Sequence, residues 1–146
     1  RHGIFTEAEF QARHEIYLEA YCKMVNIEGK TCVDMVQHQI LPAALKYTSF
    51  LCDSVLKKEA LGASCNAEKR LIQRLCETTD ALFVCCEELK AGLKHVRPAG
   101  TEEMARYFRD EIVSRMDTLR QHADLLEKLT DKAYWPYPTY SDLLYY

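Results

Sequence analysis

Apolar residues recur at intervals of three and four along most of this sequence, and few residues interrupt the pattern. Only 5 glycines and 4 prolines occur among 146 residues, and no stretch alternates apolar and polar residues as a strand would. The sequence therefore predicts an all-α fold, an elongated up-down helical bundle of about four long helices. A chain of this length is expected to form a single domain around one core.

The first helix is predicted to start near Glu7. Thr6 and Glu9 have the spacing of a capping box, in which each residue satisfies a free backbone N–H of the other. From there the periodicity predicts one buried stripe up to about residue 26, made of Phe10, His14, Tyr17, Tyr21 and Met24.

A second helical stretch is expected from about residue 27 to residue 61. Gly29 and Pro42 are expected to interrupt it, because glycine disfavours a helix interior and proline removes a backbone donor, with a kink near residues 38 to 42. Gly62 is the expected C-cap. The buried face should consist of Val36, Ile40, Ala44, Tyr47, Leu51 and Val55.

Two more helices are predicted after this turn. The third has a nearly heptad seam, which requires an antiparallel neighbour; its members are Leu71, Leu75, Thr78, Leu82, Cys85, Leu89 and Val96. Thr101 is the expected N-cap of the fourth. That helix should bury Met104, Phe108, Ile112, Met116, Leu119, Ala123 and Leu126.

The last fourteen residues, AYWPYPTYSDLLYY, contain six aromatic residues and two prolines. Since proline restricts its own φ and the preceding residue, the sequence predicts a bundle over residues 1–132 and an extended tail over residues 133–146. The tail is expected to pack on the bundle, on another domain or on a neighbouring subunit. The candidate docking residues are Trp135, Pro136, Tyr137, Pro138, Tyr140, Leu143 and Leu144.

Composition excludes several classes of partner. The net charge of −3 provides no basic excess for a nucleic-acid backbone, and no apolar run is long enough to span a membrane. The seven cysteines include no CxxC motif, which favours a reducing cytoplasm, with Cys85 and Cys86 as core-filling residues. The absence of an initiator methionine suggests a piece of a longer polypeptide.

No catalytic, cofactor-binding or metal-binding residue is predicted. The glycines are isolated from one another, so they do not form a phosphate-binding loop. Asp34 and His38 share a helix face and could be two ligands of a metal, or simply a polar pair beside Pro42. His14 is expected to be a core histidine, and His95 suits the negative end of a helix. Glu15 and Glu19, like Glu87 and Glu88, indicate a solvated face.

Two stretches of the sequence resemble a known family. The segment RHEIYLEAYCKMVNIEGKTCVDMVQHQILPAALKYT, residues 13 to 48, is similar to a tyrosine-rich helical region of type III glutamine synthetases. The segment WPYPTYSDLL, residues 135 to 144, resembles the tryptophan-proline-aromatic-proline-threonine-tyrosine signature near the end of those enzymes. The sequence departs from the family at Gly29 and Ser141.

The resemblance implies a C-terminal accessory domain of an oligomeric, ring-forming glutamine synthetase. Such enzymes join ammonia to glutamate with ATP and with Mg²⁺ or Mn²⁺, which bind to an upstream catalytic domain. This fragment alone is expected to be inactive and to have no cofactor of its own. An autonomous helical module that binds a partner protein is the alternative.

Overall fold

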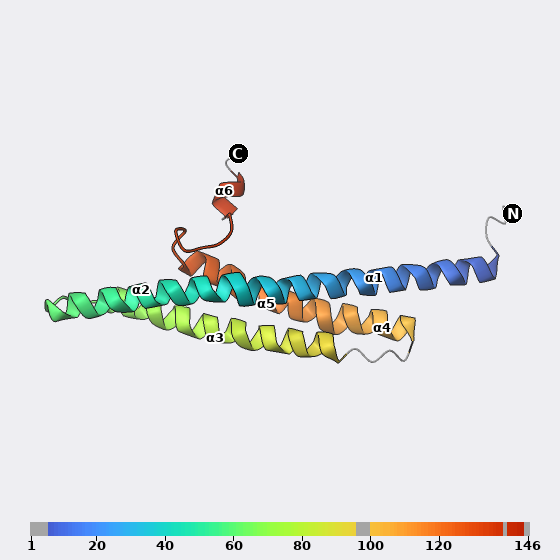
Figure 1. Ribbon diagram of the computed structural model, residues 1–146, viewed down its shortest axis with the longest axis horizontal. Helices are drawn as coiled ribbons and strands as arrows, with labels where there is room; N and C mark the ends of the chain where they lie inside the picture. The colour runs from blue at the N-terminus through green and yellow to red at the C-terminus, as the bar shows by residue number, and fades with distance from the viewer. Residues whose placement is uncertain (1–5, 96–99, 139, 145–146) are drawn as a thin grey trace.

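The computed structural model describes residues 6–95, 100–138 and 140–144, and within these ranges it contains helices and no strand (Figure 1). This confirms the predicted all-α helical bundle. The α-helices are α1 (Glu7–Met35), α2 (Leu41–Ala60), α3 (Asn66–Lys94), α4 (Thr101–Tyr107), α5 (Val113–Leu129) and α6 (Tyr140–Leu144). Two π-helical segments, η1 (Val36–Ile40) and η2 (Phe108–Ile112), lie between α-helices.

A single helical rod makes up the first part of the chain, because α1, η1 and α2 follow one another without a break. At 1.5 Å per residue the rod is roughly 80 Å long. It begins with the predicted capping box: the Glu9 backbone N–H donates to Thr6 Oγ1 (3.3 Å), and the Thr6 N–H donates to Glu9 Oε2 (2.8 Å).

The predicted division between a first and a second helix near residue 26 is wrong, since α1 continues through it. Gly29 is buried and does not interrupt the helix. A Cβ atom added at this position would lie 3.0 Å from Leu93 Cδ2. The glycine therefore serves packing, because it allows α1 to approach the end of α3 closely.

The disturbance predicted near Pro42 takes the form of η1. The Leu41 N–H donates to the carbonyl of Val36, which widens this turn by one residue. Pro42 follows immediately, and it has no N–H to donate in the next turn. A second wide turn, in which the Val113 N–H donates to the carbonyl of Phe108, had no counterpart in the sequence predictions.

Gly62 ends the rod as predicted. Its φ of +77° is in the left-handed region, its N–H donates to Glu59 O (2.8 Å), and the Ala63 N–H donates to Lys58 O (3.1 Å). This pair of bonds is a Schellman motif, which satisfies carbonyls at the end of α2. The chain then reverses into α3, which packs against α1, α2 and α5.

The seam of α3 is close to the predicted one but is displaced by one residue at two positions. Thr79 and Cys86 are buried, whereas the predicted Thr78 and Cys85 are only half-buried. Val96, the predicted end of the seam, lies outside the described residues. The buried residues of α3 follow one another at alternating intervals of four and three from Leu75 to Leu89 and then continue to Gly92: Leu75, Thr79, Leu82, Cys86, Leu89 and Gly92.

The rod formed by α4, η2 and α5 returns along α3 and α1. Its predicted face is confirmed: four of the seven residues are buried, and Met104, Met116 and Ala123 are half-buried. The buried members are Phe108, Ile112, Leu119 and Leu126. The predicted N-cap is one residue late, because Gly100 occupies that position and Thr101 is the first residue of α4.

The stripe predicted to be buried in the first helix is largely exposed. Phe10, His14, Tyr17 and Met24 face solvent, and Tyr21 is half-buried. The residues of α1 that enter the core are Cys22, Val25, Gly29 and Val33. In Figure 1 the first turns of α1 extend beyond α4, so the bundle offers them no neighbour.

Candidate functional site

The C-terminal tail leaves the bundle through a turn organised by Asp131. Its carbonyl accepts from the N–H groups of Tyr134 (2.9 Å) and Trp135 (3.1 Å), and its carboxylate accepts from the Ala133 N–H (2.7 Å). Aspartate is suited to this role because its short side chain can bond to the backbone two residues on. The turn directs the following aromatic residues toward the long rod.

Tyr134 contacts two aromatic rings of α2. Its ring centroid lies 5.2 Å from that of Tyr47 and 5.8 Å from that of Phe50, with tilted ring planes. Aromatic pairs at these separations contribute about 0.5–1.5 kcal/mol beyond the area they bury. Burial, followed by the negative charge of Asp131, raises the pKa of Tyr47.

Trp135 and Tyr137 are half-buried and pack against the hydrophobic core. The Oη of Tyr137 is shielded from solvent and has no hydrogen-bond partner in the part of the chain that the structure describes. Burial, and after it the charge of Asp34, raises the pKa of this tyrosine. The tail thus covers the bundle close to the junction of α1 and α2.

The second half of the tail stands away from the bundle (Figure 1). The extended course predicted for the tail does not hold for residues 140–144, which form the short helix α6. The Asp142 carboxylate forms an ion pair with Lys132, which ties α6 back to the turn. Leu143 and Leu144 are exposed, with no apolar surface of the described bundle covering them.

Some of the predicted docking residues therefore pack on the bundle, and others are exposed to solvent. Trp135 and Tyr137 lie on the bundle, whereas Pro136, Pro138, Leu143 and Leu144 are exposed; the side chain of Tyr140 lies outside the described residues. The contact of Tyr134 with Tyr47 and Phe50 was not predicted. Its only signal in the sequence is the spacing of Tyr47 and Phe50, which puts both rings on one side of a helix.

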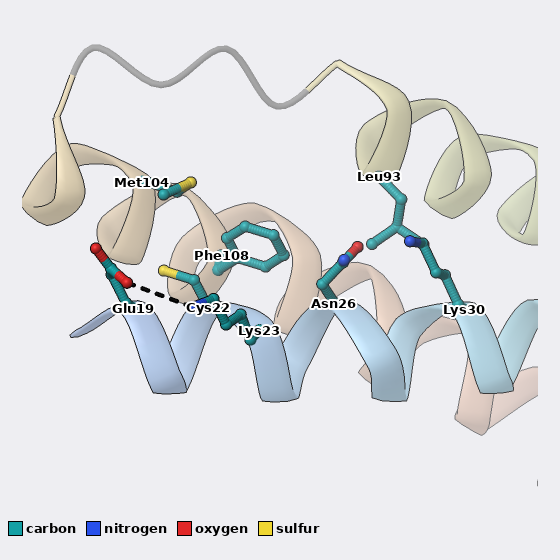
Figure 2. Close-up of a pocket in the computed structure, with 8 residues that line it drawn as sticks. All are labelled: Glu19, Cys22, Lys23, Asn26, Lys30, Leu93, Met104 and Phe108. Atoms are coloured by element: carbon teal, nitrogen blue, oxygen red, sulfur yellow. Dashed lines mark hydrogen bonds and ion pairs between the residues drawn. The ribbon is translucent and has the colours of Figure 1, made fainter. Parts of the chain in front are cut away.

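An open groove of about 310 Å³ lies between α1, the end of α3 and the start of the α4–η2–α5 rod (Figure 2). Leu93, Met104 and Phe108 form its apolar part. The polar part comes from α1 and includes the ion pair between Glu19 and Lys23 (3.3 Å). The lining residues contributed by α1 are Glu19, Cys22, Lys23, Asn26 and Lys30.

The groups in this groove are suited to binding rather than to covalent chemistry. Cys22 is the one thiol in its lining, and burial raises the pKa of this thiol, which disfavours the reactive thiolate. All seven cysteines are free, and burial also raises the pKa of four others, namely Cys32, Cys76, Cys85 and Cys86.

The polar pairs noted in the sequence lie on the surface. Asp34 Oδ1 and His38 Nε2 are 3.5 Å apart, and both side chains are exposed. Within residues 6–95, 100–138 and 140–144, no group of three His, Cys, Asp or Glu side chains could hold a metal ion. His95 caps α3 as expected, with Nδ1 2.8 Å from the carbonyl of Ala91. His14, predicted to be in the core, is exposed and stacks on Phe10.

Comparison with known proteins indicates where such a bundle occurs. Residues 1–59 match the family model of the glutamine synthetase C-terminal domain. A glutamine synthetase of Butyrivibrio fibrisolvens is 32% identical over 99% of this chain, and the type-3 glutamine synthetase of Dictyostelium discoideum is 24% identical over 98%. A glutamine synthetase of Bacteroides fragilis is 26% identical over 97%.

The chain is an all-helical bundle with an aromatic tail; it is similar to glutamine synthetases over nearly its whole length and to the family model of their C-terminal domain over residues 1–59. It spans only about a fifth of the length of these relatives, 21% in the bacterial protein from Butyrivibrio and 20% in the other two. None of the described helices has the length and apolar character needed to cross a membrane.

Proposed function

We propose that this chain is the C-terminal accessory domain of a glutamine synthetase, and that it stabilises and helps to assemble an enzyme whose chemistry lies upstream. The observation that carries the proposal is the match along nearly the whole chain to about one fifth of each relative. The remaining four fifths would contain the site that joins ammonia to glutamate. In that arrangement ATP and Mg²⁺ or Mn²⁺ bind to the upstream part, and the enzyme is a cytoplasmic homo-oligomer.

The surface of the bundle supports a structural role. Its exposed large apolar side chains lie on α1, α2, α3, α5 and α6 and in the turn after α2, and they are most numerous on α1. The groove in Figure 2 combines apolar and charged side chains, which suits it to binding. An accessory domain needs apolar surface of this kind to contact its enzyme, because burying it provides the main driving force for association.

The tail is proposed to act as a clamp in two parts. The segment from Tyr134 to Tyr137 would anchor it on its own bundle through aromatic contacts with Tyr47 and Phe50. Leu143 and Leu144, exposed on α6, would contact the upstream domain or a neighbouring subunit. The domain would then extend over residues 1–132, with residues 133–146 as the clamp.

Removing the whole domain from the full-length enzyme tests the proposed function. We expect the truncated protein to lose thermal stability and to form smaller assemblies, as measured by size-exclusion chromatography with light scattering alongside glutamine formation. A truncated enzyme that assembles and turns over normally would refute a structural role. If the region is instead encoded as a separate protein, the autonomous interaction module is the better description.

The clamp is tested by Trp135→Ala in the full-length enzyme. Trp135 is half-buried against the core, so its truncation should lower stability by roughly 2 kcal/mol and weaken assembly. Leu61→Ala, at an exposed position in the turn after α2, is the matched control and should change neither. A Trp135→Ala enzyme that melts and assembles like the control would refute the clamp.

A further inference from the structure

We propose that the outward side of α1 is the surface on which the upstream part of the same glutamine synthetase chain docks. This surface, the outer α1 face, consists of Phe10, Ile16, Tyr17, Met24 and Ile27. The inference rests on the proposed function and adds a location and a partner to it. Three of these residues, Phe10, Tyr17 and Met24, belong to the stripe that helical periodicity predicts to be buried.

The outer α1 face is apolar and exposed. Phe10, Ile16 and Tyr17 are 65%, 64% and 72% exposed, and Met24 and Ile27 are 53% and 64% exposed. Burying large apolar side chains is favourable, so leaving all five in water is costly. A run of large apolar residues along one helix is typical of a contact surface rather than of scattered surface residues.

The bundle itself does not cover this face. At about 100° per residue, the centre of the outer α1 face lies roughly 160° around the helix from the centre of the buried side. The buried side, which contacts α3, α4 and α5, is formed by Cys22, Val25, Gly29 and Val33. Any partner of the outer face must therefore come from outside the described bundle.

The first three turns of α1 strengthen this inference. Every residue from Thr6 to Tyr17 is exposed, and in Figure 1 these turns project past α4. An isolated helix of about twelve residues is marginal in water, even with a capping box. A second contact along this segment would supply the packing that the bundle does not provide.

The length of the relatives points to the upstream chain as the occupant. The chain accounts for only 20% or 21% of each relative, and the matched family model is that of a C-terminal domain. In such a protein the preceding sequence is covalently joined to the N-terminal side of α1, the helix that carries the outer α1 face. Covalent linkage raises the effective concentration of the upstream part at this face.

A photo-crosslinking amino acid at Tyr17 of the full-length enzyme tests the occupant. We expect adducts with peptides that precede the 146-residue region, at the mass of a single chain. The same probe at Leu56, which is 66% exposed near the far end of the rod, is the matched control and should give few or none. Adducts at Tyr17 within residues 1–146, at twice the chain mass, or none above the Leu56 level would each overturn the proposal.

A pair of charge substitutions separates this inference from the proposed function. Ile16→Glu should speed amide hydrogen exchange across residues 7–27 of the full-length enzyme by about tenfold or more, because the docked face is lost. Leu56→Glu, at matched exposure, should leave that segment unchanged. If domain removal impairs assembly but Ile16→Glu behaves like Leu56→Glu, the accessory role stands and this docking surface is wrong.

Discussion

The ring of Tyr134 lies 5.2 Å from the ring of Tyr47, centroid to centroid, at an interplanar angle of 46°. The first aromatic residue of the tail is thereby held on α2. Tyr47 had been predicted to be a core residue of its helix, and it is half-buried partly because the tail covers it. The tail is thus part of the packing of the bundle.

The coupling of these two rings can be measured in a double-mutant cycle. Tyr134→Ala and Tyr47→Ala should each destabilise the protein, and the double variant should lose about 1 kcal/mol less than the sum. Denaturant unfolding of the four proteins measures the coupling. Phe83→Ala, an exposed ring on α3, paired with Tyr134→Ala should be additive. Additive losses for Tyr47 and Tyr134 would mean that their contact contributes nothing.

The Tyr137 hydroxyl predicts a dependence of stability on alkaline pH. Burial raises the pKa of Tyr137 in the folded state, so folding favours the protonated phenol. This contribution to the free energy of unfolding is fully present below the unfolded-state pKa of about 10. It is lost as the pH rises through the folded-state pKa. Tyr137→Phe should therefore lose less stability than the wild type between about pH 8 and about pH 11. Chemical denaturation at the two pH values is the measurement.

The same substitution should not destabilise the protein near neutral pH. The Tyr137 Oη is shielded from solvent and has no partner among the described residues, so removing it eliminates a desolvation cost of about 1 kcal/mol. A clear loss of stability in Tyr137→Phe at neutral pH would show that the hydroxyl has a bonding partner.

Substitution of Gly62 should destabilise the protein because of its backbone conformation alone. A Cβ atom there would meet nothing within 4 Å, yet the φ of +77° strains any L-residue. Gly62→Ala should cost about 1 kcal/mol, and Gly62→Asn less, because asparagine tolerates the left-handed region. Ser64→Ala, in the same exposed turn, serves as the control in thermal unfolding. An equally small change in all three would contradict the backbone argument.

Substitution of Gly29 should destabilise the protein for a different reason, because the side chain of Leu93 packs closely against it. A Cβ atom would lie 3.0 Å from Leu93 Cδ2, and a valine would add two further methyl groups. Gly29→Val should cost about 1–3 kcal/mol through overpacking. Glu28→Val, at the adjacent exposed position, is the control. Unfolding curves that coincide for the two variants would mean that Leu93 moves aside freely.

Much of the fold could be predicted from helical periodicity, because a stripe of apolar residues identifies a face that must be covered. The faces of α2 and of the α4–η2–α5 rod were found in this way. The seam of α3 was displaced at Thr79 and Cys86 because each has a neighbour of the same residue type, and periodicity does not distinguish between Thr78 and Thr79.

The failures have identifiable physical causes. Periodicity shows that Phe10, Tyr17 and Met24 share one side of a helix, but it does not show whether the bundle or another surface covers that side. Helix propensity treats Gly29 as a break, whereas the close approach of Leu93 makes it a packing requirement. The turn at Asp131 and the resulting contact of Tyr134 depend on tertiary geometry that no local pattern contains.

The Schellman turn at Gly62 has a practical consequence for the study of this protein. Residues 61–64 are exposed and lie at the opposite end of the rod from the first turns of α1 (Figure 1). Loop tips of this kind tolerate insertions best. An affinity tag or a fluorescent protein inserted between Ala63 and Ser64 would leave both chain termini native while the intact enzyme is purified or imaged.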